Sequence, residues 1–179
     1  DKNAIMALPD GPAKDLAIIN YGPWDRMDDN HPFIDGYGAK PAGACFYPAD
    51  MTKEEFDALE DPAKMSPYTL IKRGEDGKLK VVWYHDEYKE SVDKIAGYLE
   101  AAATMTIKES VRNYLLKRAE ALRTDSYKES DYAWMDMKDS KMDLVIGPIE
   151  NYEDGINGLK TSYECFILLK DLKKTDELT

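Results

Sequence analysis

The stretch MDLVIGPIENYEDGINGLKTSYECFILLKD, residues 142–171, has two apolar runs on either side of a loop rich in glycine, asparagine and acidic residues. The pairs Asp154-Gly155 and Asn157-Gly158 are typical of tight turns, because glycine accepts positive φ and Asx side chains bond to the nearby backbone. We therefore predict an antiparallel β-hairpin over 142–171. The residues expected on one face of its second strand are Tyr163, Cys165, Ile167 and Leu169.

The first apolar run ends on a carboxylate and a phenol, Glu150 and Tyr152. Alternation along a strand would place these two side chains on the same face. Taken alone, the pair also fits a solvated carboxylate at a strand end beside a packed aromatic ring. Local pattern therefore leaves the purpose of the pair open.

A second hairpin is predicted upstream, over residues 68–84. Two β-rich runs there flank the turn sequence Gly-Glu-Asp-Gly, which predicts strands near 68–73 and 79–84. We expect Tyr84-His85 to close the second of these strands.

The apolar period changes after this hairpin to that of a helix. Residues 86–123 predict two amphipathic helices, and their short connection at 104–106 implies antiparallel packing. Thr106 and Glu109 have the spacing of a capping box at the start of the second helix. The positions expected on the buried stripe of the second helix are Val111, Tyr114, Leu115, Arg118 and Leu122.

The first third of the chain, residues 1–67, is rich in proline and glycine and predicts only short elements. We expect an extended segment over 15–21 and a helix that opens with a capping box on Thr52 and Glu55. Aromatic residues throughout this third favour an ordered wrap over a linker. With 179 residues and 43% apolar content, residues 1–179 are expected to form a single α+β lobe of antiparallel hairpins and a helical pair.

The charge of the chain excludes some classes of partner. The 24 basic and 35 acidic residues give a net charge of −11, which repels nucleic acid and anionic membrane surfaces and favours a cationic group such as a peptide amine. No run reaches the roughly 18 apolar residues of a membrane helix. The sequence opens on Asp1 without a methionine, so it leaves cytoplasm and periplasm open as the compartment.

The usual catalytic motifs are missing from the sequence. It has no G-x-S-x-G elbow, P-loop, G-x-G-x-x-G, EF-hand loop or glutamate-rich Nudix helix. His31 and His85 are isolated, and consecutive ligand-type residues after His85 splay apart on either a helix or a strand. Cys45 and Cys165 are expected to be free thiols, with Cys165 buried in its strand. We therefore predict no catalytic residue and no metal site in this chain.

Several long strings resemble a known family. They are NYGPWDRMDDNHPFIDGYGAKPAGACFYPADMTKEEF (20–56) and LLKRAEALRTDSYKESDYAWMDMKDSKMDLVIGPIENYEDGINGLKTSYECFILLKD (115–171). With the helices between them, they are similar to the bacterial branch of the dipeptidyl peptidase III-like zinc peptidases. The pattern G-P-I-E-N-Y at 147–152, before an acidic loop with glycines, is the most specific part of the resemblance.

The resemblance implies a longer protein with two lobes around a cleft. In that family zinc sits on a His-Glu-X-X-Gly-His motif and a downstream glutamate, none of which occurs in these 179 residues. The chain resembles the portion before this motif. The resemblance therefore implies that the chain forms much of the lobe that faces the zinc. Zinc is then expected in a C-terminal portion, with no cofactor in this chain, which alone would be inactive. Similar segments are fused to Nudix domains in some relatives.

The resemblance also gives Glu150 and Tyr152 an expected function. The matching glutamate is implicated in holding the N-terminal ammonium of a peptide, and the matching tyrosine in contacting the peptide near the scissile bond. The implied partners are a peptide with a free N-terminus and the catalytic lobe of the same polypeptide. The alternative is a noncatalytic peptide-binding or structural module derived from the family. A His-Glu-X-X-Gly-His motif beyond Thr179 would favour the peptidase.

Overall fold

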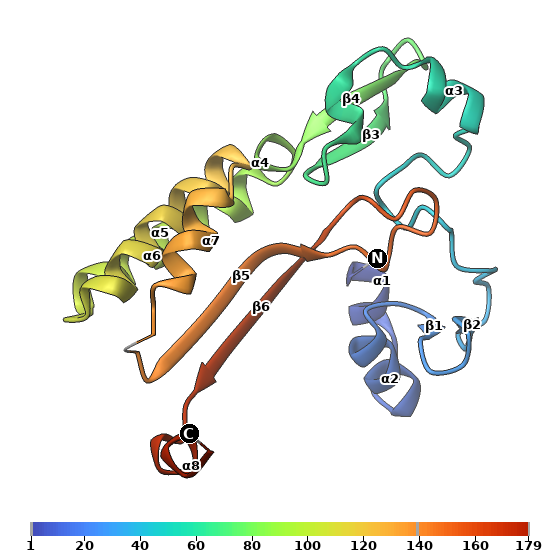
Figure 1. The fold of residues 1–179 in the computed structure, drawn as a ribbon. Helices are drawn as coiled ribbons and strands as arrows, with labels where there is room; N and C mark the ends of the chain where they lie inside the picture. Colours follow the sequence, from blue (N-terminus) through green and yellow to red (C-terminus); the bar gives the residue numbers. More distant parts are fainter. Residues whose placement is uncertain (1, 139, 179) are drawn as a thin grey trace. The chain divides into compact units, whose positions relative to one another are not determined.

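The computed structural model describes residues 2–138 and 140–178, and the chain divides into two compact units, 1–44 and 45–179. The expectation of one lobe stays a prediction. The first unit contains α1 (Lys2–Ala7) and α2 (Pro12–Asn20), followed by the short antiparallel pair β1 (Trp24–Asp25) and β2 (His31–Pro32) (Figure 1).

The extended segment predicted over 15–21 is wrong, because these residues belong almost entirely to α2. Pro12 stands in the first turn, where its missing N–H breaks no helical hydrogen bond and its fixed φ suits the helix. Tyr21 ends the helix with a left-handed φ of 54°. The helix thus starts at Pro12, in a region where the proline and glycine content had indicated a loop.

The second unit opens with α3 (Lys53–Ala58), the 3-10 helix η1 (Pro62–Met65), and the antiparallel strands β3 (Thr69–Arg73) and β4 (Leu79–Trp83). The capping box of α3 is confirmed. Thr52 Oγ1 accepts from the Glu55 N–H at 3.2 Å, and Glu55 Oε2 accepts from the Thr52 N–H at 3.0 Å. The hairpin is confirmed as well, but Tyr84 starts a helical turn instead of ending the strand.

Four helices follow this hairpin: α4 (Tyr84–Glu87), α5 (Lys89–Met105), α6 (Glu109–Thr124) and α7 (Lys128–Met135). The antiparallel pair is confirmed as α5 and α6. The capping box predicted for α6 is wrong, because α6 starts at Glu109 itself and Thr106 Oγ1 accepts from the Lys108 N–H at 3.2 Å, not from Glu109. The Arg112 guanidinium donates to the Glu109 carboxylate at 2.9 Å and to the Thr106 carbonyl at 2.8 Å.

The main core lies between these helices and the second hairpin. Leu144, from the first strand of that hairpin, is buried in it, and Ile146 and Tyr163 pack against it. The whole stripe predicted for α6 is buried, including the Arg118 guanidinium. The core residues from the helices and the segment after them are Val92, Ala96, Leu99, Ala103, Val111, Tyr114, Leu115, Ala119, Ala121, Leu122, Tyr127, Ala133 and Met137.

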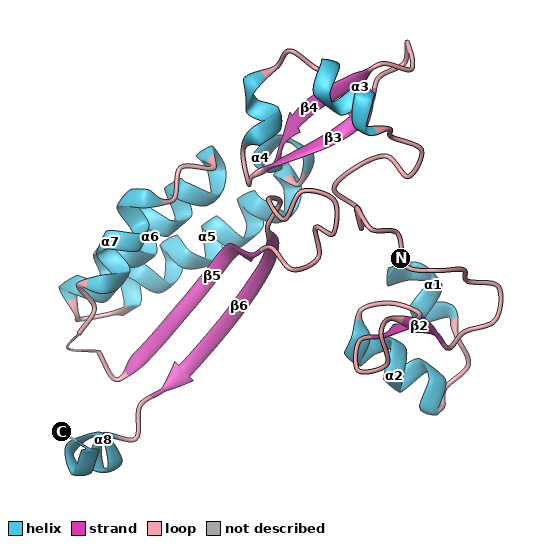
Figure 2. Cartoon of the chain, turned by 45° about the vertical axis from the view of Figure 1, so that its right-hand side comes forward, coloured by secondary structure: helices cyan, strands magenta, loops and turns pink. Residues whose placement is uncertain are grey.

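The quoted stretch forms the antiparallel ribbon β5 (Met142–Glu150) and β6 (Ser162–Leu169), and α8 (Leu172–Leu178) follows it (Figure 2). In the described residues the two hairpins form separate two-stranded sheets. Cys45 and Cys165 are free, as predicted, but Cys165 is exposed. Here β6 pairs only with β5, which leaves Cys165 and the next four residues uncovered. The α+β class is confirmed.

Candidate functional site

The end of β5 is shaped by a glycine and a bulge. Gly147 has φ 141°, and a Cβ placed on it would come within 3.2 Å of Arg118 Nη1 and 3.3 Å of Tyr127 Cε1. Only glycine lets the strand pass this close to α6 and the start of α7. The register then shifts between Pro148 and Glu150. A bulge of this kind redirects the side chain that follows it. Glu150 therefore does not continue the regular alternation of side chains between the two faces of β5.

The structure brings the two predicted site residues together. Glu150 is half-buried at the end of β5, whereas Tyr152 lies in the following turn with 74% of its surface exposed. The Glu150 carboxylate, as an acceptor for the Tyr152 hydroxyl, raises the pKa of Tyr152, and burial and the charges of Glu150 and Glu164 act in the same direction. A turn, not strand alternation, therefore makes the pair, which presents an acidic, solvent-facing site.

A buried carboxylate holds the loop that follows the pair. Asp154 is 3% exposed, and its Oδ2 accepts from the Tyr47 hydroxyl at 2.8 Å. Backbone hydrogen bonds hold the pKa of this carboxyl below its usual range against the opposing effect of burial. The backbone N–H groups that donate to it belong to Ile156, Asn157, Leu159 and Lys160. One side chain thus organises the whole turn.

A buried ammonium fixes the far end of the same loop. Lys160 is fully buried, and its Nζ donates to the Lys64 carbonyl at 2.8 Å, the Ser66 carbonyl at 2.7 Å and Thr69 Oγ1 at 2.7 Å. Thr161 adds a backbone bond to the Pro67 carbonyl at 3.0 Å. Sequence reasoning missed both anchors, since a lysine in a glycine-rich loop has the pattern of a solvated residue.

The stability contributed by Lys160 should depend on pH. Burial lowers its pKa to about 8, against a smaller opposing effect of Asp154. Between about pH 8 and pH 10.5 the unfolded chain binds more protons at Lys160 than the folded chain, so folding becomes more favourable as pH rises. We expect the unfolding free energy of the parent to rise by about 3 kcal/mol relative to Lys160→Met across this window.

Chemical denaturation of both proteins at several pH values from 7.5 to 10.5 measures this difference, and comparison with the mutant cancels the tyrosines that titrate in the same range. Lys94→Met, which removes an exposed lysine of α5, is the matched control and should show no such trend. A difference between parent and Lys160→Met that stays constant with pH would contradict the prediction.

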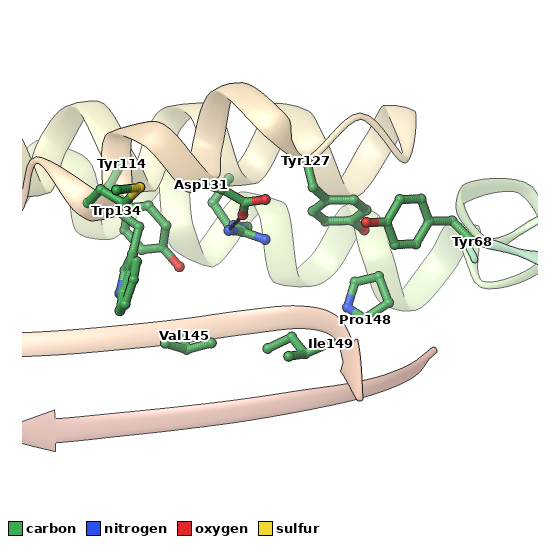
Figure 3. A pocket seen from close by; sticks show the side chains of 10 residues that line it. Tyr68, Tyr114, Tyr127, Asp131, Trp134, Val145, Pro148 and Ile149 are labelled. Carbon is green, nitrogen blue, oxygen red and sulfur yellow. Dashed lines mark hydrogen bonds and ion pairs between the residues drawn. The ribbon is translucent and has the colours of Figure 1, made fainter. Parts of the chain in front are cut away.

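A cavity of about 390 Å³ lies on the helix side of β5, between α6, α7 and the strand (Figure 3). Its polar centre is the Arg118 guanidinium, which lies 5.5 Å and 5.3 Å from the ring centres of Tyr114 and Tyr127 and pairs with Asp131 at 2.5 Å. Burial raises the pKa of both tyrosines. These contacts support the strand that ends on Glu150.

Neither histidine belongs to a metal site in the described residues. His85 Nδ1 lies 2.7 Å from Asp125 Oδ2, and Asp125 also accepts the His85 N–H at 3.1 Å, so the imidazole ties α4 to the end of α6. Across residues 2–138 and 140–178, no three His, Cys, Asp or Glu side chains come together in a way that could hold a metal ion. None of the described helices combines the length and apolar character needed to cross a membrane.

Comparison with known proteins decides the family. The sequence model of peptidase family M49 matches residues 49–179. The chain belongs to peptidase family M49. This agrees with the resemblance to dipeptidyl peptidase III-like enzymes carried by the G-P-I-E-N-Y pattern.

Two solved structures resemble this M49 chain along most of its length. Dipeptidyl peptidase III from Caldithrix abyssi is 41% identical with a TM-score of 0.87, over 99% of this chain and 35% of that one. Dipeptidyl-peptidase III from Corallococcus sp. strain EGB is 34% identical with a TM-score of 0.85, over 93% of this chain and 32% of that one. The M49 chain thus spans about a third of the length of these relatives.

A curated relative of the M49 chain is Nudix hydrolase 3 from Arabidopsis thaliana. It is 31% identical in an alignment 218 residues long that covers 92% of this chain and 28% of that protein. The M49 family is zinc-dependent, yet the described residues offer no fitting set of zinc ligands. The described residues do place a carboxylate, Glu150, and a phenol, Tyr152, at the end of β5.

Proposed function

We propose that this chain is the substrate-cleft lobe of a dipeptidyl peptidase III-like zinc peptidase that removes dipeptides from peptide N-termini. The observation that carries the proposal is the Glu150–Tyr152 pair at the end of β5. It is supported by M49 membership and by 41% identity to a dipeptidyl peptidase III over 99% of the chain.

The pair suits a peptide amine. An enzyme that releases dipeptides must place its scissile bond two residues from the free N-terminus, and a fixed carboxylate at one end of the cleft sets that distance. A carboxylate and an ammonium form a charge-assisted hydrogen bond, about twice as strong as a neutral one. Glu150 is half-buried and lies at the paired end of β5, opposite Ser162, so its backbone position is set before the peptide arrives.

Tyr152 contributes a second contact. Glu150 raises the pKa of Tyr152 as a hydrogen-bond acceptor, and a carboxylate has about four acceptor sites, so Glu150 can accept from Tyr152 and from an ammonium together. The exposed ring then lies beside the first residues of the bound peptide, toward the scissile bond. The net charge of −11 further favours a cationic peptide end.

Zinc, held by the other portion of the longer polypeptide, would supply Lewis-acid activation and the water nucleophile. The residues of this chain bind and orient the peptide amine. If zinc binding and peptide binding are separated in this way, this chain holds no zinc centre of its own.

The test compares the chain alone with the polypeptide that continues through a His-Glu-X-X-Gly-His motif. We expect the chain alone to keep less than stoichiometric zinc after dialysis and to leave a dipeptidyl-2-naphthylamide intact, because a catalytic zinc requires three protein ligands and an open position. The longer polypeptide should release naphthylamine, and removal of its zinc by a chelator should abolish this. Turnover by the chain alone, or none by the zinc-loaded longer protein, would contradict the proposal.

A further inference from the structure

The loop that carries Tyr152 is held at its base by two buried charged groups. Its tip, residues 155–158, is exposed and includes two glycines, which normally makes a loop mobile. The side chains of Asp154 and Lys160 nevertheless form hydrogen bonds to backbone and hydroxyl groups in the loop and in residues 47–69. The loop is therefore ordered from inside, by side chains that no solvent reaches.

The anchors reach across large distances in sequence. The Tyr47 hydroxyl donates to Asp154 and accepts from Asn157 Nδ2 at 3.1 Å, and these pairs lie 107 and 110 residues apart. Tyr47 also packs edge-on against Phe56, with ring centres 6.0 Å apart. The loop is thus fixed against α3 as well as against η1 and the start of β3.

Burying two ions in this way costs free energy. An apolar pair of similar size would avoid the desolvation of an ammonium and a carboxylate, and buried ionic groups often add no net stability. The two ions instead provide directional hydrogen bonds, and each ion fixes several groups at once. These hydrogen bonds determine the position of the Tyr152 turn relative to Glu150.

We propose that Asp154, Lys160 and Tyr47 are positioning residues, which hold the 151–161 loop so that Tyr152 and Glu150 form a site for a peptide amine before the peptide binds. The inference rests on the proposed function of the pair. None of the three needs to touch the peptide. They raise the affinity of the unbound polypeptide for an N-terminal ammonium, because a site that is already ordered does not lose this freedom when the peptide binds.

The first test uses kinetics of the complete zinc-loaded polypeptide on a free-amine peptide. Tyr47→Phe removes one hydroxyl and keeps the ring on Phe56, so the fold should survive; Lys160→Met is the stronger variant. We expect KM to rise about 3- to 10-fold for Tyr47→Phe, and more for Lys160→Met, with kcat per active site changed less than about 2-fold. The matched controls Tyr98→Phe and Lys94→Met, on exposed positions of α5, should leave KM unchanged.

A purely structural function gives a different result. If the anchors only stabilise the fold, the variants lose active protein, which lowers the apparent kcat equally for all substrates and leaves KM unchanged; that outcome would overturn the inference. In a Glu150→Gln background, Tyr47→Phe should change KM by less than about 2-fold, because the contact it positions is already gone. A full additional effect there would also overturn it.

The second test does not depend on activity. Chymotrypsin cuts after exposed tyrosines in mobile backbone, so Lys160→Met should be cut after Tyr152 at least about 10-fold faster than the parent, with cutting after Tyr21 unchanged. Unchanged cutting after Tyr152 would overturn the inference. The proposed function fails by another route, namely if Glu150→Gln affects free-amine and acetylated peptides equally, so the two failures are distinguishable.

Discussion

In the complete polypeptide, the proposed function predicts that Glu150→Gln lowers kcat/KM on peptides with a free N-terminus by about 30-fold to several thousand-fold. Glutamine keeps the shape of the side chain and removes its charge. The substrate ammonium then enters the cleft without its charged partner, and breaking one side of a desolvated pair costs roughly 2 to 5 kcal/mol. Steady-state kinetics on one peptide with a free and one with an acetylated N-terminus measure the effect.

The acetylated peptide is the internal control. It offers no ammonium, so parent and Glu150→Gln should cleave it at nearly the same low rate. Glu164→Gln is the matched variant, because Glu164 influences Tyr152 only through its charge, whereas Glu150 also acts as the hydrogen-bond acceptor. We expect Glu164→Gln to lose only about 2- to 5-fold, as for a screened charge. Equal losses on both peptides would mean that Glu150 acts on folding or on the chemical step.

Leu115→Ala is expected to lower the unfolding free energy of the chain by about 2 to 5 kcal/mol. Leu115 is 2% exposed and belongs to the core between α5, α6 and β5, so alanine leaves a cavity that the neighbouring helices close only in part. Chemical denaturation gives the value from the shift in midpoint at constant slope.

The neighbouring Leu116 provides a control of the same chemistry. It lies on the same helix with 47% of its surface exposed, so Leu116→Ala should cost less than about 1 kcal/mol. A Leu115→Ala midpoint indistinguishable from that of the parent would show that the core lies elsewhere.

The helical pair could be predicted because its signal is local. The stripe of α6 repeats every three to four residues, and each member is buried as the period requires. The Thr52 capping box depends on two residues three apart and was equally accessible. Even Glu150 could be found, because a carboxylate that ends an apolar strand stands out in the printed sequence.

The anchors of the candidate site could not be found in this way. Lys160 bonds to groups 91 to 96 residues away, and no local pattern distinguishes it from a solvated lysine. At Thr106 the local pattern was present, but α6 starts three residues later, at Glu109, and the Glu109 carboxylate pairs with Arg112 instead of reaching back to Thr106. Cys165 was predicted wrongly for a related reason. An alternating apolar strand is buried only where a second layer of structure covers it, and the strand's own sequence does not show whether that layer is present.

That uncovered strand also bears on how the chain behaves in concentrated solution. Phe166, Ile167, Leu168 and Leu169 are 51% to 74% exposed, and an exposed apolar run on a strand without proline or glycine is a template for intermolecular β-pairing. The net charge of −11 opposes such pairing by keeping copies apart. Since salt screens that repulsion and leaves the apolar attraction in place, the colloidal stability of this chain should fall as ionic strength rises.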